Sequence, residues 1–234
     1  MGKTKVIQEF ESVKEKHPSL HLRPMDDDAW EIFGKLHFSG KFQLRTVEDV
    51  YQIRIYVPPK YPQVLPRVWE LGSRISDDYH KFSDEALCLG TSLDVKVNFH
   101  KHPNLLGFIE ESIVPYFFRY SYKLKYGIFP FGDRSHGIDG VIEHYKELFS
   151  THDLIDVVKL LGILVCQNYQ EDQQCPCLSG KTIEQCHGDV LLKLLEYQSI
   201  DEYIDDFLEI ERVFRFRRDL LKKNLHQYLM RINR

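Results

Sequence analysis

The chain lacks any long apolar run and any excess of positive charge. No stretch approaches the roughly 20 consecutive apolar residues that a membrane-spanning helix needs. The first residues, Met1-Gly-Lys-Thr-Lys-Val-Ile-Gln-Glu, lack the apolar centre of a secretory signal peptide. The 31 Lys and Arg residues are outnumbered by 35 Asp and Glu, which gives a formal net charge of -4. Affinity for phosphate backbones rests on clustered Lys and Arg, so this balance disfavours a generic nucleic-acid binder.

Cysteine is scarce as well. The chain has 5 cysteines, an odd count, and Cys175, Cys177 and Cys186 crowd into one short segment. A disulfide framework spreads paired cysteines along a secreted domain, which this pattern does not resemble. We therefore expect a reducing, cytoplasmic location.

The hydrophobic and aromatic composition is typical of a globular protein with a packed core. Hydrophobic residues make up 43% of the chain and aromatic residues 13%, which is ample material for a core. A chain of 234 residues accommodates either one large domain or a domain of about 150 residues with a smaller appendage. We predict an α+β fold, with one domain over residues 1–150 and a helical extension over 151–234.

The first half of the chain begins with a helical pattern and continues with strands. Apolar residues recur at three- to four-residue spacing over 4–16, and His17-Pro18 ends this run. Strands are predicted over 29–38, 50–57 and 67–72, in an antiparallel meander. The clearest alternation is that of Tyr51, Ile53, Ile55 and Val57 with polar neighbours. The prolines at 58, 59, 62 and 66 then predict a rigid, extended connector.

Helical patterns dominate the rest of the chain. An apolar stripe over 104–125 predicts a helix that Pro115 kinks or divides in two. A glycine-rich loop over 130–140 precedes a predicted helix at 141–149. Another helix is expected over 153–169, where Cys166 lies on an apolar run and is assigned a structural role. Further helices are expected up to the C-terminus.

One cysteine stands apart from the others. Cys88 lies between apolar neighbours and Gly90, and His80 precedes it by eight residues. The thiolate is the nucleophilic form of cysteine, and a free thiol titrates near ~8.5, so a catalytic Cys88 needs help from its surroundings. The alternative is a small buried hydrophobe, which is what a lone cysteine commonly is.

Residues from about 4 to 149 resemble the ubiquitin-conjugating-enzyme fold. The resemblance rests on the N-terminal helix, the antiparallel meander, the Tyr61-Pro62…Pro66 connector, and Cys88-Leu89 in a loop before a helix. The loop 130–137 and the helix after it look like bacterial members found in antiphage operons. The resemblance covers roughly 60% of the chain, by the domain bounds expected above.

This resemblance implies thioester chemistry. Cys88 would take the C-terminus of a ubiquitin-like modifier from an activating (adenylating) enzyme, then pass it to an amine on a protein target. His80 occupies the position of the family's asparagine, eight residues before the cysteine. An imidazole can also donate a hydrogen bond to the oxyanion of the reaction, and the alternative is that His80 is an ordinary loop histidine. A non-catalytic module of the same fold, which only binds a ubiquitin-like protein, is the alternative.

Two positions depart from the family pattern. Tyr120 stands where an acidic residue is expected, and Lys96 stands where a tryptophan is expected. Other groups would then have to keep the incoming lysine neutral, although each candidate also reads as an ordinary surface residue. The candidates are Asp94, Asp133, His100, His102 and His136. The histidines at 80, 100, 102 and 136 are too scattered for metal-ligand spacing, so we do not predict a metal site there.

A compact cysteine cluster follows in the second half. The segment Cys175-Pro-Cys177-Leu-Ser-Gly-Lys-Thr-Ile-Glu-Gln-Cys186-His187 offers three thiolates and an imidazole, which can close a tetrahedral Zn²⁺ site. It resembles the SEC-C zinc motif, with Leu178 in place of the usual glycine. Four protein ligands leave no open position, so the expected zinc is structural, with a role in pinning the C-terminal helices or docking a partner. The alternative is a cytosolic cysteine cluster without a metal.

The C-terminal segment also holds a basic stretch with interleaved aromatics, Arg212-Val-Phe-Arg215-Phe-Arg217-Arg218, followed by Lys222-Lys223. Such a stretch can bind nucleic acid. Five acidic residues lie close by, at 205, 206, 209, 211 and 219, so we expect a solvated helix face instead, and nucleic acid is not an expected partner.

Overall fold

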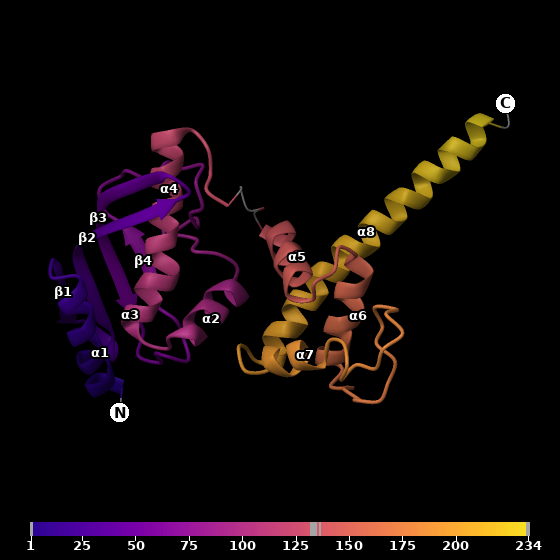
Figure 1. The fold of residues 1–234 in the computed structure, drawn as a ribbon, viewed down its shortest axis with the longest axis horizontal. Helices are drawn as coiled ribbons and strands as arrows, with labels where there is room; N and C mark the ends of the chain where they lie inside the picture. Colours follow the sequence, from indigo (N-terminus) through magenta and orange to yellow (C-terminus); the bar gives the residue numbers. More distant parts are fainter. Residues whose placement is uncertain (1, 132–134, 136, 233–234) are drawn as a thin grey trace. The chain divides into compact units, whose positions relative to one another are not determined.

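The computed structural model describes the backbone of residues 2–131, 135 and 137–232, and the side chains of residues 4–131, 135 and 137–219. The chain forms two compact units, Met1–Arg134 and Ser135–Arg234. The first unit combines helices with an antiparallel sheet, and the second is helical (Figure 1). The predicted α+β class is confirmed.

Helix α1 (Gly2–Lys16) opens the first unit, as predicted. Its apolar stripe is buried, because Val6, Phe10 and Val13 are exposed by no more than 9%. The helix ends just before His17, whose backbone N–H still reaches the carbonyl of Val13 at 2.7 Å. Pro18 cannot continue the helix, since it has no N–H to donate.

Four antiparallel strands form one sheet in the order β1-β2-β3-β4. They are β1 (Leu20–Pro24), β2 (Trp30–Phe42), β3 (Arg45–Val57) and β4 (Arg67–Glu70). The predicted alternation in β3 is confirmed, because its four apolar positions from Tyr51 to Val57 are at most 1% exposed. Strand β1 was not predicted. Only Leu20 of its five residues is buried, so it shows no alternation.

Helix α4 (Val114–Tyr126) covers the apolar face of the sheet, and Figure 1 shows it lying across the strands. It is preceded by α3 (Leu105–Phe108), which packs on α1, and by a π-helical turn η2 (Ile109–Ile113). The ring of Phe117 on α4 stacks on Tyr51 of β3 with centroids 4.2 Å apart. The π turn lies directly before Pro115 and is closed by the bond from Val114 N–H to the Ile109 carbonyl. The predicted kink or division at Pro115 takes the form of this π turn: the backbone stays right-handed helical through it, and Pro115 lies in the first turn of α4, where its missing N–H is tolerated.

The second unit contains α5 (Gly137–Leu148), α6 (Leu154–Val165), α7 (Gly188–Leu194) and α8 (Ile200–Ile232). Helices α5 and α6 both pack against α8. The Tyr145 hydroxyl on α5 donates to the Asp206 carboxylate on α8 at 2.6 Å. The helix expected to close the first domain therefore belongs to the second unit, and the division lies after residue 134 rather than after 150. Tyr145 and Phe149 are both buried there.

Two further expectations concern surface properties. Cys166 is exposed at the C-terminal cap of α6, so it takes no part in the apolar core expected around it. Within the described helices, none is both long enough and apolar enough to cross a membrane.

Candidate functional site

The Cys88 loop is a short hairpin attached to the edge of the sheet. The backbone N–H of Cys88 donates to the carbonyl of His80 at 2.8 Å, and Lys81 pairs with Leu87 in an antiparallel bridge. The N–H of Leu87 donates to the carbonyl of Val68 on β4, also at 2.8 Å. The eight-residue spacing seen in the sequence therefore places Cys88 and His80 opposite each other, and their contact runs through the backbone.

The thiol of Cys88 is half-buried. Its Sγ lies 3.7 Å from the carbonyl oxygen of Gly90. Gly90 adopts a φ of +150°, and a Cβ added there would meet the Asp94 Cβ at 3.1 Å, so a glycine suits this turn. Burial raises the pKa of the Cys88 thiol, and the negative charge of Asp94 raises it further. The thiolate fraction at neutral pH is therefore small.

An aromatic cluster supports the residue opposite Cys88. The ring of Tyr79 lies 4.7 Å from the His80 imidazole at an interplanar angle of 89°. Tyr79 also contacts the rings of Tyr116 and Tyr120, with centroid distances of 5.3 and 4.7 Å. The Tyr116 hydroxyl donates to the His80 carbonyl at 3.2 Å. The Cys88 loop is thus packed against the aromatic rings of Tyr79, Tyr116 and Tyr120.

Tyr120, which stands where the resemblance predicts an acidic residue, is buried and has a structural role. Its hydroxyl donates to the carbonyl of Arg74 at 2.9 Å and accepts from the N–H of Ser76 at 3.0 Å. The Arg74 guanidinium in turn forms a two-armed ion pair with the Asp49 carboxylate, with both N–O distances 2.9 Å. These contacts hold the segment that leads into the Cys88 loop against β3 and α4.

The other candidates for deprotonating a lysine differ in their surroundings. Asp94 forms a capping box with Thr91 at the start of α2 (Ser92–Lys101), where its carboxylate accepts from the Thr91 backbone N–H at 3.0 Å. His100 contacts the carbonyl of Lys96 through Nδ1 at 3.1 Å. His102 lies 3.9 Å from the Glu111 carboxylate. Asp133 and His136 lie outside the described residues. The structure gives Asp94 a helix-capping role and places the two described histidines on the surface.

The cysteine cluster of the second unit is built on two tight turns. The N–H of Cys175 donates to the carbonyl of Lys181 at 2.9 Å, and that of Ile183 donates to Gln173 at 2.8 Å. Leu178 occupies the turn with a φ of +62°, and its side chain is 83% exposed. A left-handed backbone conformation favours glycine, so a glycine would adopt this position with less strain than Leu178 does.

The four ligand atoms converge. They come from Cys175, Cys177, Cys186 and His187, and all lie within 4.8 Å of one another. The Cys177 Sγ lies 3.4 and 3.5 Å from the other two sulfurs. The His187 Nδ1 lies 3.2 and 3.3 Å from Cys175 and Cys186. A tetrahedral zinc with Zn–S bonds of about 2.3 Å has ligand–ligand edges of about 3.5–3.8 Å. The distances of 3.2–3.5 Å are slightly shorter than these edges, so the four atoms approximate a tetrahedral site and need only a small outward shift to hold the ion.

The surroundings of the cluster suit a metal site. The His187 Nε2 donates to the carbonyl oxygen of Phe149 at 2.8 Å, which leaves the Nδ1 lone pair facing the thiols. Burial raises the pKa of Cys175, and so do the neighbouring thiols. Burial acts in the same direction on Cys177, but hydrogen bonds from Ser179 and the other thiols outweigh it and lower the pKa of Cys177. A divalent cation would stabilise all three thiolates together.

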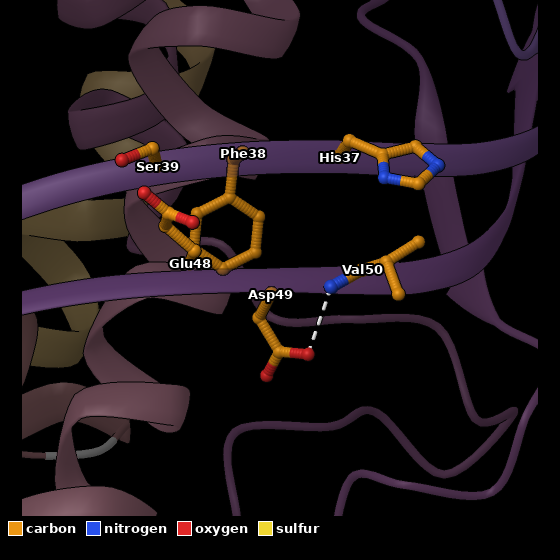
Figure 2. A pocket seen from close by; sticks show the side chains of 6 residues that line it. All are labelled: His37, Phe38, Ser39, Glu48, Asp49 and Val50. Atoms are coloured by element: carbon orange, nitrogen blue, oxygen red, sulfur yellow. Dashed lines mark hydrogen bonds between the residues drawn. The ribbon is translucent and has the colours of Figure 1, made fainter.

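A pocket that the sequence did not indicate lies between β2 and β3 in the first unit. Its volume is about 460 Å³, and it is lined by three cross-strand pairs, His37 with Val50, Phe38 with Asp49, and Ser39 with Glu48 (Figure 2). The Asp49 carboxylate there accepts from the Val50 N–H, from Arg74 and from the Ser121 hydroxyl. Its charge is already compensated within the protein, so we assign the pocket no chemistry.

The Cys88 loop belongs to the first unit and the cysteine cluster to the second, and each is described here by its own geometry. Comparison of the chain with protein-family models, with curated proteins and with solved structures finds no match.

Proposed function

We propose that the first unit is a ubiquitin-conjugating-like domain and that Cys88 carries a ubiquitin-like modifier as a thioester. The order of elements supports this, because a helix, a four-stranded antiparallel meander and helices flank the cysteine loop. The observation that carries the proposal is the backbone hydrogen bond between Cys88 and His80. It holds the two residues opposite each other on the facing strands of one hairpin.

The proposed reaction has two acyl transfers. The Cys88 thiolate attacks the carbonyl of the thioester on the activating enzyme, and the activating enzyme's thiolate leaves. An amine of the protein target then attacks the new thioester, forms an amide and expels the Cys88 thiolate. The His80 imidazole donates to the oxyanion formed in each step.

The raised pKa of Cys88 bears on both steps. A weakly acidic thiol is ionised to a small extent at neutral pH, yet its thiolate is the stronger nucleophile. The same thiolate is a poorer leaving group, so its thioester is expected to persist until a suitable amine arrives. A carrier that must not discharge to water gains from this property.

A second function, a non-catalytic binding module for a ubiquitin-like protein, is favoured by one observation. No described charge partner lowers the pKa of Cys88, and burial raises it instead. The two functions differ in whether the modifier becomes covalently attached.

We also propose that Cys175, Cys177, Cys186 and His187 hold a structural Zn²⁺. The donor set and its spacing support this ion over Mg²⁺ or Ca²⁺, which prefer oxygen ligands. When bound, the zinc cross-links the two turns of the cluster and needs no further ligand.

The proposed partners are the modifier, its activating enzyme and a protein target, in a bacterial antiphage setting. Nucleic acid is not among them. Of the basic stretch on α8, Arg215 pairs with Glu211 at 2.6 Å and Arg217 pairs with Asp139 at 2.7 Å, which supports a solvated helix face. The side chains of Lys222 and Lys223 lie outside the described residues.

The test is reconstitution with an activating enzyme, a ubiquitin-like protein from the same genome and ATP. Wild-type protein should form an adduct that a reducing agent cleaves, and Cys88→Ala should form none. Cys166→Ala, which removes the exposed cysteine, serves as the matched control and should behave as wild type. A reducible adduct that persists in Cys88→Ala contradicts the assignment.

A further inference from the structure

We propose that Tyr116 is a positioning residue that holds the His80 peptide against Cys88 and thereby regulates the reactivity of the thiol. The inference deepens the proposed function and rests on it where catalysis is concerned. Its geometric part concerns Cys88 alone and is testable without any modifier.

The carbonyl oxygen of His80 is the centre of this arrangement. It accepts from the Cys88 backbone N–H at 2.8 Å and from the Tyr116 hydroxyl at 3.2 Å. One donor comes from the loop itself, and the other comes from α4, 36 residues away in the chain. With two donors the carbonyl direction is determined, and so is the orientation of the peptide that carries the His80 imidazole.

The ring of Tyr116 is itself held in place. It is 5% exposed and packs on Tyr79 and Phe117, with centroids 5.3 and 5.4 Å away. Tyr79 also packs edge-on against the His80 imidazole. Removing the hydroxyl while keeping the ring therefore preserves the packing and removes only the hydrogen bond.

The Tyr116 hydroxyl remains a donor over the working pH range. Burial raises its pKa, and the nearby charges of Tyr79 and Cys88 raise it further. A thiolate at Cys88 thus opposes ionisation of Tyr116, so the hydroxyl keeps its proton while Cys88 reacts. The hydrogen bond to His80 is available in both ionisation states of the thiol.

Without this donor, the His80 carbonyl loses its hydrogen bond to α4 and keeps the bond from the Cys88 N–H on the facing strand of the hairpin. Loss of a neutral hydrogen bond corresponds to a change of about fivefold to tenfold in a local equilibrium. We expect Tyr116→Phe to open the Cys88–His80 bridge by that factor. The thiol would become more accessible to a small reagent, and His80 would be less well placed as an oxyanion donor.

The experiment compares Tyr116→Phe with Tyr51→Phe. Tyr51 is a fully buried tyrosine of the same core, and its hydroxyl lies 2.7 Å from the Ser121 Oγ, so its hydrogen-bond partner is a side chain of α4 and not the His80 carbonyl. Both variants lose one buried hydroxyl, so a general loss of stability affects both. The readouts are hydrogen exchange at the Cys88 amide and the pH profile of Cys88 alkylation by iodoacetamide, with the exposed Cys166 as internal reference.

The proposal expects Tyr116→Phe to speed Cys88 amide exchange and alkylation by about fivefold to tenfold. Tyr51→Phe should leave both within about twofold of wild type, and Cys166 should react equally in all three proteins. Equal changes in the two variants, or no change in either, overturn the positioning role. Absence of any thioester in wild type, together with the expected exchange data, refutes the proposed function and leaves the positioning role standing.

Discussion

The imidazole of His187 and the carbonyl of Phe149 are joined by a 2.8 Å hydrogen bond from Nε2. The Phe149 ring also packs edge-on against the imidazole, with centroids 6.1 Å apart. This contact connects the chain just after α5 to the cysteine cluster. It makes the proposed zinc site part of the packing of the second unit.

Removing the metal should therefore loosen the second unit. We expect one Zn²⁺ per chain, and we expect chelation to increase hydrogen exchange after residue 137 while residues 29–90 keep their protection, because metal binding is coupled to folding. Cys186→Ser should lower metal content and stability, whereas Cys166→Ser should change neither. Elemental analysis and hydrogen exchange decide the matter: a reduced, metal-free protein with the same protection contradicts the site.

His80→Ala should slow discharge of the thioester to an amine more than it slows loading. The loss of one oxyanion donor costs about 10²–10³ in rate where that donor dominates. The control is His100→Ala, which removes an exposed histidine of the same unit. Single-turnover discharge to free lysine measures the effect. A rate within about twofold of wild type would assign His80 a purely structural role.

Glu110 should make the first unit sensitive to acid. The hydrogen bond from His17 lowers the pKa of Glu110 against the opposing effect of burial, and Lys16 lowers it further. The pKa is lower in the folded state than in the unfolded state. The stabilisation is therefore complete above the unfolded pKa of about 4.3, and it is lost as pH falls through the folded pKa.

The variant that tests this is Glu110→Gln, with the neighbouring Glu111→Gln as control. At pH 7 the first substitution should destabilise the protein by about 1 kcal/mol, a value that allows for partial solvent screening. The difference from wild type should shrink as the pH falls below about 4. Urea unfolding at several pH values measures it. An equal difference at pH 3 and pH 7 would mean that the negative charge of Glu110 contributes nothing through its contacts with His17 and Lys16.

Helices and strands whose apolar residues recur at regular spacing were predictable from the sequence. Val6, Phe10 and Val13 mark α1, and the alternation up to Val57 marks β3. Strand β1 was not predictable, because Leu20 is its sole buried residue. The pattern of α5 predicts a helix but does not say which core it faces, so the boundary between the units was placed 16 residues too late, at 150 instead of 134.

In the sites too, contacts between residues close in the sequence were predictable, and contacts between residues far apart were not. The four metal-ligand candidates lie within 13 residues, so their spacing in the sequence was enough to predict that they form one site. Their backbone partner, the carbonyl of Phe149, is 38 residues from His187 and has no sequence signal. The contact of Tyr116 with His80 spans 36 residues and also runs through a carbonyl. Such contacts depend on how α4 and α5 pack, which the sequence does not show by inspection.

The most direct test of the central claim is the mass of the protein in denaturant after reaction with the activating enzyme, modifier and ATP. The account predicts an increase equal to the mass of the modifier less one water, located on Cys88 by peptide mapping and reversed by a reducing agent. Cys88→Ser should carry the same increase as an ester that resists the reducing agent, or no increase at all. An unchanged mass, with the modifier held only in native conditions, would contradict the enzyme and leave a binding module.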